Sequence, residues 1–301
     1  MFAGITVALF SGAIIDRMRF VAYLAFGLIW TTLVYDPLAH WVWGDGGWLR
    51  TLGALDFAGG TVVHISAGVT ALVLAKVLGP RRDFKRVPTV PHNVPFALLG
   101  AGMLWFGWFG FNAGSNLEAN GGAALAMINT FTATAGAILA WAAVEAILRG
   151  KASMLGAASG LVAGLVAVTP AAGSIGPVGA IALGGLASVA CYFFVAVVKN
   201  KFGYDDSLDV FGIHGIGGII GAVGTGIFTA PGLGGVGGDD YSIASQTWIQ
   251  IEAVAITIVW CGVASAILLY ITKAITGLRV EGDDERRGLD LSSHGEQAYH
   301  S

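Results

Sequence analysis

The feature that most constrains this chain is a series of nine long apolar stretches separated by polar connections. A helix of about 20 apolar residues crosses the ~30 Å hydrocarbon core of a bilayer. Hydrophobic residues make up 55% of the sequence and charged residues 12%, too little charge to cover a soluble protein of this size. The stretches predict an all-α polytopic membrane protein, with spans at 2–15, 20–38, 56–78, 94–113, 121–147, 153–170, 175–198, 209–229 and 247–275. The first span is shorter than a full crossing, so we expect the chain to begin inside a helix.

Lysine and arginine fall on alternate connections between these spans, with Arg50 as the one exception. Because basic connections face the cytoplasm, this alternation sets the orientation of the spans. Residues 1–276 are therefore expected to form a transmembrane domain of a multi-pass protein in the cell membrane. The hydrophilic residues 277–301 are expected to form a cytoplasmic tail, which is either simply solvated or docked on the cytoplasmic face.

Several residue types exclude other classes of function. Cys191 and Cys261 lie inside apolar spans and are interpreted as small core residues, so neither a disulfide nor a metal site is expected. The net charge is −3 and the chain has no basic tract, so no nucleic-acid partner is expected. No cofactor motif is found. Glu145 and Glu252 lie near span ends, where a side chain can reach the interface, and no transport role is assigned to them.

Two glycine-rich segments each place one histidine inside an apolar span. Asp56 precedes His64 in the first segment, and Asp209 precedes His214 in the second. An ionisable residue at membrane depth is costly, and it marks a pathway or a partner more often than simple packing. Each aspartate is interpreted either as a helix N-cap or as a direct ligand. The matched segments predict two halves that face each other across a pathway lined by the two histidines.

Aromatic residues gather at one end of the spans. Trp41, Trp43 and Trp48 lie in one connection, where they form either an interfacial belt or, for one of them, the roof of a cation site. Phe111 and Ser115 end the span at 94–113 and place a hydroxyl beside an aromatic ring. This pairing predicts a vestibule at the outer end of the pathway.

Five motifs together resemble the ammonium transporter (Amt/Mep) family. They are DFAGGTVVH, WFGWFGFNAGS, GLVAGLVAVTPAAG, DVFGIHGIGG and the tail pattern RGLD followed by SHGE. The match runs from Phe2 to the end of the chain, in order and at the family's spacing. Trp43 and Ser115 favour the bacterial Amt type over the related Rhesus branch.

The resemblance implies the ammonium-transporter fold, in which eleven transmembrane helices form two inverted five-helix repeats and a final long helix. It also implies a homotrimer with one pore in each subunit. About nine of the eleven segments are expected here, without the first two helices and the start of the third. Inverted repeats are common among transporters, and they make the two Asp…His segments equivalent.

The resemblance also implies residue roles. Phe2, Trp43 and Ser115 resemble the outer ammonium site, and Phe2 with Phe111 resembles an aromatic gate. His64 and His214 resemble the twin-histidine pair of the pore. Supporting positions are implied for Asp56, Trp108, Thr169 and Asp209.

The implied function is transport of ammonium or ammonia across the lipid bilayer, and no enzymatic activity is expected. The aromatic site recruits the cation, which loses a proton and passes along a hydrophobic pore whose imidazoles relay protons. The alternative is an ammonium sensor or scaffold, whose tail signals through a PII-type regulatory protein at the cytoplasmic face. A membrane enzyme using the histidines is a third, weaker reading, because no nucleophile or metal-ligand spacing accompanies them.

Overall fold

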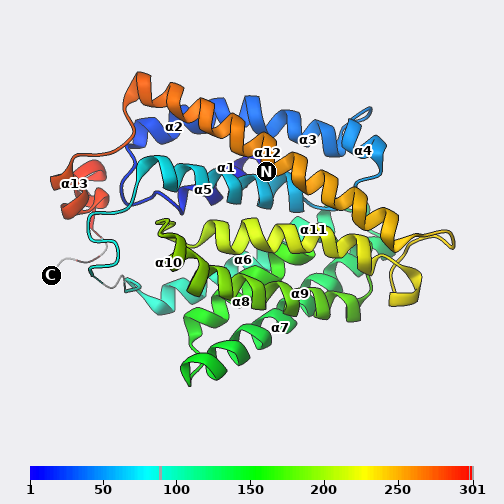
Figure 1. Cartoon of the computed structure of the whole chain (residues 1–301). Coiled ribbons are helices and arrows are strands. Elements are labelled where there is room, and N and C mark those ends of the chain that lie inside the picture. Colours follow the sequence, from blue (N-terminus) through cyan, green and yellow to red (C-terminus); the bar gives the residue numbers. More distant parts are fainter. Residues whose placement is uncertain (88–89, 298, 300–301) are drawn as a thin grey trace.

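The computed structural model describes residues 1–87, 90–297 and 299, and within these ranges the regular structure is helical. All nine predicted spans are helices (Figure 1). In the described part of the chain, seven helical segments are long and apolar enough to cross a membrane, and two shorter helices, Phe2–Ser11 and Met154–Val168, are also apolar.

The α-helices are α1 (Phe2–Ser11), α2 (Phe20–Trp30), α3 (Asp36–Trp43), α4 (Trp48–Leu52), α5 (Ser66–Leu78), α6 (Val94–Gly114), α7 (Gly121–Arg149), α8 (Met154–Val168), α9 (Pro177–Phe193), α10 (Lys199–Phe202), α11 (Ile216–Phe228), α12 (Ile243–Thr276) and α13 (Gly282–Arg287). Wider π turns are η1 (Thr31–Tyr35), η2 (Gly60–Ile65), η3 (Phe194–Val198), η4 (Phe211–Gly215) and η6 (Asp290–His294), and η5 (Pro231–Leu233) is a 3₁₀ turn.

Several predicted boundaries shift for local reasons. The first helix ends at Ser11 and not at 15, because the chain turns there toward the next helix. The second continues through η1 into α3 and ends at Trp43, before Gly44 in extended conformation. The helical segment that carries His64 starts at Gly60, because residues 56–59 are occupied by a cap.

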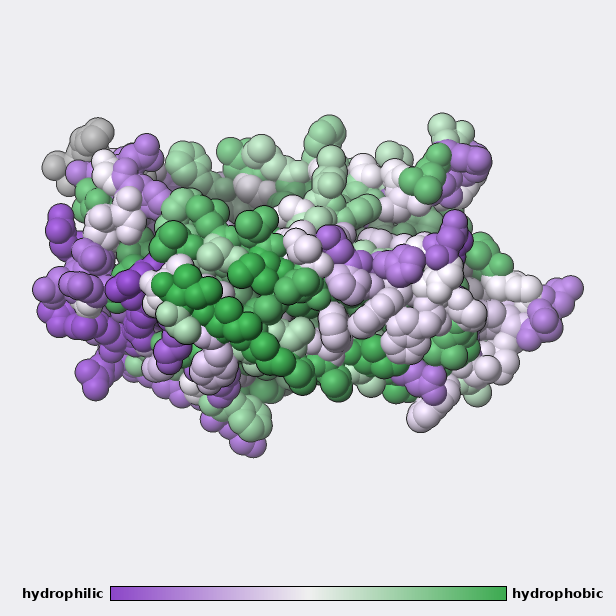
Figure 2. Space-filling view, turned by 90° about the horizontal axis from the view of Figure 1, so that it is seen from above, coloured by the Kyte–Doolittle hydropathy of each residue, from purple (hydrophilic) through white to green (hydrophobic). Residues whose placement is uncertain are grey.

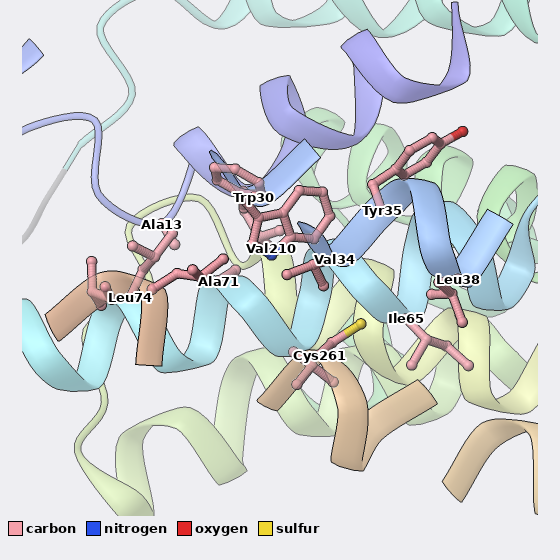
Figure 3. Packing of buried hydrophobic residues seen from close by; sticks show 14 of the residues in the cluster. Ala13, Trp30, Val34, Tyr35, Leu38, Ile65, Ala71, Leu74, Val210 and Cys261 are labelled. Carbon is pink, nitrogen blue, oxygen red and sulfur yellow. The ribbon is translucent and has the colours of Figure 1, made fainter. Parts of the chain in front are cut away.

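The helices form two packed groups that meet along α5 and α11 (Figure 1). One group contains α1, α2, α3, α5 and α12, and its apolar core includes Trp30, Val34 and Cys261 (Figure 3). Trp30 Nε1 donates to Ser265 Oγ at 2.9 Å, and Ser265 in turn lies 2.9 Å from Thr70 Oγ1. This buried polar chain fixes α2, α12 and α5 relative to one another.

The second group contains α6, α7, α8 and α9, packed against α11. Its helices approach closely at glycines. A Cβ on Gly184 of α9 would lie 2.2 Å from the carbonyl oxygen of Ala133 of α7. Close approach at small residues is the main way that helices associate where lipid removes the hydrophobic driving force.

Hydrophilic residues gather at the two ends of the bundle, and most of the hydrophobic surface in this view lies between them (Figure 2). At one end, which we call the basic end, Arg17 is fully buried and donates to Gly79 O, Asp205 O and Ser207 Oγ at 3.0, 2.5 and 3.0 Å. Arg17 therefore joins three connections that are distant in sequence.

The tail lies on the basic end (Figure 1). Arg279 donates to the carbonyl oxygens of Leu78 and Pro80 at 3.1 and 2.9 Å. Glu285 accepts from both Arg279 and the backbone of Arg82. Of the two readings of the tail, the docked one fits its described residues, and the contact is made at the end of the His64 helix.

Candidate functional site

The two histidines meet at the centre of the bundle. His64 comes from η2 and His214 from η4, and their Nδ1 atoms are 3.2 Å apart. The rings are nearly parallel, with centroids 5.3 Å apart, and only 1% and 8% of the two residues is exposed. A neutral imidazole has one donor and one acceptor nitrogen, so the pair shares one hydrogen bond. Among the described residues, the buried His64 Nε2 has no hydrogen-bond partner.

Glycines bring the two histidine-bearing helices together. A Cβ on Gly68 would lie 2.3 Å from the amide nitrogen and 2.4 Å from the Cα of Gly215. Gly68 follows His64 by one helical turn, and Gly215 directly follows His214. The backbones therefore touch where the histidines face each other, and this contact determines the spacing of the pair.

This contact predicts that Gly68→Ala separates the two helices. Overfilling a packed contact costs about 1–3 kcal/mol, and a backbone neighbour has little room to relax. We expect a lower melting temperature in detergent together with impaired transport. Gly100→Ala on α6 is the matched control, because no atom lies within 4 Å of the added Cβ. Unchanged melting and transport for Gly68→Ala would contradict the close contact.

Asp56 caps the helix that carries His64. Its Oδ1 accepts from the amides of Gly59 and Gly60 at 2.8 and 2.6 Å, and its Oδ2 accepts from the amide of Thr61 at 2.8 Å and from the Thr61 hydroxyl. A carboxylate at the positive end of a helix is favoured both by these donors and by the helix dipole. Of the two readings of Asp56, the cap matches these contacts. Trp43 Nε1 donates to the backbone carbonyl oxygen of Asp56 at 2.7 Å, and this hydrogen bond connects the vestibule to the cap.

Asp209 does not repeat this arrangement, and here the sequence interpretation was wrong. Its carboxylate pairs with Lys199, and its backbone has a φ of 61°. Asp206 instead accepts from the amide of Phe211 at 2.7 Å and caps η4. Asp206 precedes His214 by eight residues, the same separation as between Asp56 and His64. That equal spacing is the signal in the sequence that could have identified Asp206 as the counterpart.

Burial raises the pKa of Asp206 to about 6, with the nearby Asp209 as a further cause. Because the folded-state pKa lies above the unfolded value, the folded state holds a proton that the unfolded state has lost between about pH 4 and pH 6. This group's contribution to stability is therefore lost as the pH rises through that window. We expect the unfolding free energy of wild type minus that of Asp206→Asn to fall by on the order of 3 kcal/mol across it. Thermal unfolding in detergent as a function of pH measures this difference, and a difference that grows with pH would contradict the assignment.

Aromatic rings connect the vestibule to the histidines. Phe2 packs edge-on against Phe111 with centroids 4.4 Å apart, and it lies 5.7 Å from Trp43. Phe111 lies 6.2 Å from His64, and Trp108 stacks on His64 at 5.3 Å with 13° between the rings. From the vestibule inward, the Phe2 ring is followed by the Phe111 ring and then by His64. Aromatic rings therefore separate His64 from the vestibule.

A cavity of about 600 Å³ opens above Phe2, lined by Trp43, Ser115 and Asp56 among others. Ser115 Oγ donates to Phe111 O at 2.8 Å, so its lone pairs remain available to a donor in the cavity. Thr169 accepts from Trp108 Nε1 at 2.9 Å and fixes the ring that stacks on His64. The predicted vestibule residues thus lie together in the structure, and Thr169 contacts the Trp108 ring that stacks on His64.

A pair of buried histidines below an aromatic-lined cavity, inside a bundle of membrane-crossing helices, defines a membrane transport protein. The family model for the ammonium transporter family matches residues 1–299. The chain therefore belongs to the ammonium transporter family, and it is a multi-pass membrane protein.

Relatives and solved structures agree with this assignment. The ammonium transporter of Aquifex aeolicus is 55% identical over 99% of this chain and 69% of its own length. That of Bacillus subtilis is 50% identical over 99% of this chain and 74% of its own length. The solved structure named Sensor Amt Protein has a TM-score of 0.91 at 31% identity and covers 97% of this chain and 74% of its own. The crystal structure of Saccharomyces cerevisiae Mep2 has a TM-score of 0.85 at 36% identity, and the match covers 94% of this chain and 65% of the Mep2 chain.

Proposed function

We propose that this chain takes up ammonium at the aromatic vestibule, removes a proton, and passes ammonia along the pore lined by His64 and His214. The observation that carries the proposal is the buried histidine pair, 3.2 Å apart between Nδ1 atoms, below a cavity lined by aromatic rings. The names of the relatives support ammonium as the substrate.

Recruitment rests on the chemistry of the vestibule. Indole presents the best cation–π face among the aromatic side chains, and Trp43 lines the cavity beside Phe2. The Ser115 hydroxyl supplies an acceptor for an N–H of the cation. Potassium is a similar cation but has no hydrogen to donate, so the hydroxyl favours ammonium over potassium.

Passage requires loss of charge, because an isolated cation is far too costly in an apolar pore. Ammonium differs from a metal cation in that it can give up a proton and continue as a neutral molecule. The imidazole pair holds one shared hydrogen bond, so each ring can accept a proton on one side and release one on the other. We infer that the edge-to-face rings of Phe2 and Phe111 exclude bulk water above this point.

Growth on limiting ammonium tests the proposal. Cells that lack their own ammonium uptake are expected to grow when they express this chain, and to stop growing when the double variant H64A/H214A replaces it. Immunoblotting of membranes controls for expression. Absence of growth with the unaltered chain present in the membrane would reject the proposed function.

Trp43→Leu tests recruitment separately from passage. A cation–π contact in a partly desolvated site is worth about 1–2 kcal/mol, so the KM for methylammonium is expected to rise about 5- to 30-fold while the maximal rate falls much less. Leucine also removes the indole N–H that donates to Asp56 O. Trp43→Phe keeps a weaker π face without that donor, so an intermediate KM separates the two effects. An unchanged KM for Trp43→Leu would contradict the recruitment role.

A second candidate function, a sensor or scaffold, is favoured by the docked tail. Arg279 holds the carbonyl oxygens at the end of the His64 helix, so a partner that displaces the tail would act on that helix. We propose residues 1–276 as the transport domain and 277–301 as a cytoplasmic regulatory tail, with a PII-type protein as its partner. We also propose a homotrimer in the cell membrane. Deleting 277–301 is expected to preserve flux and abolish regulation in a transporter, and to abolish the signal in a sensor.

A further inference from the structure

A groove lined by tryptophans lies on the outer surface of α12, near the vestibule end. We call it the tryptophan groove, and its residues are Trp41, Trp48, Trp260, Ile256 and Val259. The Trp41 ring lies 4.9 Å from that of Trp260 and 5.8 Å from that of Trp48. Trp48 is 46% exposed and Val259 64% exposed, so nothing in the described part of the chain covers them. The groove therefore presents aromatic faces to the surrounding medium.

Glu252 lies at the head of this groove. It lines the adjoining pocket together with Trp48 and Thr51. With the residues that the structure describes, its carboxylate forms no hydrogen bond or ion pair. The other glutamate near a span end, Glu145, is satisfied by the backbone and hydroxyl of Ser153 at 2.9 and 3.0 Å. Glu252 is thus a half-buried carboxylate on an apolar helix, beside aromatic faces and without a partner.

An apolar stripe runs from the groove toward the basic end. Val259, Val263, Ile267 and Ile271 of α12 are 46–64% exposed and are spaced by four residues, which places them on one face of the helix. At ~1.5 Å per residue the stripe is about 18 Å long, close to one leaflet of the ~30 Å hydrocarbon core. The stripe has the length of an acyl chain and begins where Glu252 and the tryptophans end.

We propose that the tryptophan groove binds a membrane lipid whose headgroup carries an ammonium group. The ammonium group of the headgroup lies against the tryptophan faces and the Glu252 carboxylate, and one acyl chain follows the stripe on α12. Aromatic faces and a carboxylate both attract a cation, and they repel a purely anionic headgroup. A primary or quaternary ammonium on a lipid satisfies the charge of Glu252 and the apolar surface below it at the same time.

Lipid titration of the purified full chain tests this site. Native mass spectrometry gives the affinity for phosphatidylethanolamine and for phosphatidylglycerol with identical acyl chains. We expect phosphatidylethanolamine to bind wild type about 5- to 10-fold more tightly than it binds Glu252→Gln, because both the charge pair and its alignment with the rings are lost. Phosphatidylglycerol is expected to bind Glu252→Gln at least as tightly as it binds wild type, because the repelling carboxylate is gone. Glu118→Gln, at an exposed carboxylate outside the groove, is expected to leave both affinities unchanged.

A second variant and a second comparison keep the test decisive. Trp48→Leu retains the carboxylate but removes an aromatic face, and it is expected to weaken phosphatidylethanolamine binding several-fold. The second comparison uses wild type alone: we expect it to bind phosphatidylethanolamine more tightly than phosphatidylglycerol. Equal affinities of wild type and Glu252→Gln for phosphatidylethanolamine would overturn the proposal. It would also be overturned if Glu252→Gln altered self-association and left lipid affinity unchanged, since the occupant would then be a second copy of the chain.

Discussion

Replacing His64 and His214 together with alanine is expected to lower methylammonium uptake at least ~100-fold, the usual minimum for losing positioned proton-transfer groups. The two imidazoles meet at the centre of the bundle, and their Nδ1 atoms lie 3.2 Å apart, within hydrogen-bond distance of each other. Without them a molecule leaving the aromatic gate finds no group that accepts or returns a proton. A single replacement leaves one imidazole, so we expect a smaller loss from either one alone.

The control for this experiment is His40→Ala, which removes an exposed histidine of α3 outside the pathway and is expected to leave uptake unchanged. Both proteins are compared at equal abundance in the membrane. If the double variant still takes up methylammonium and still excludes potassium, the pore needs no histidine relay. The proposed mechanism would then be wrong, even if the chain transports ammonium.

Replacing Asp56 with alanine is expected to abolish transport and to lower the unfolding free energy by about 3–5 kcal/mol. The carboxylate accepts hydrogen bonds from four backbone amides and one hydroxyl in a buried position, and its removal leaves those donors unsatisfied. The same loss frees the start of η2, which positions His64. Asp56→Asn keeps one acceptor oxygen, so its loss of stability is expected to be smaller.

Asp45→Ala is the matched control for this second prediction. Asp45 pairs with Arg50, but its side chain is 99% exposed, and surface pairs contribute only ~0–1 kcal/mol. Thermal unfolding in detergent and uptake in membranes measure both variants. An Asp56→Ala protein that melts like wild type would contradict the capping role.

Apolar length and the spacing of basic residues predicted the nine helices, because lipid leaves a chain few other ways to satisfy its backbone. The ends of the helices were harder to predict from the sequence. The shift from 56 to Gly60 depends on the cap by Asp56, and the extension of the second span to Trp43 depends on a π turn with no clear sequence signal.

The vestibule and the histidine pair were predicted by motif, but their geometry was not. His64 and His214 are 150 residues apart, so only the fold can show that their Nδ1 atoms face each other. The sequence comparison selected Asp209, because a leucine precedes it as one precedes Asp56. The structure favours Asp206, since a cap depends on reach to the first helical amides and not on the neighbouring letters. The role of Arg17 was missed, because burial of an arginine in a connection depends on partners from distant segments.

The most direct test of the account is uptake of radiolabelled methylammonium into proteoliposomes that contain only this purified chain. We expect saturable uptake that excess ammonium abolishes and that an equal excess of potassium leaves unchanged. Uptake no greater than in protein-free liposomes, or uptake that potassium suppresses as strongly as ammonium, would contradict the claim that this chain forms a pore selective for ammonium.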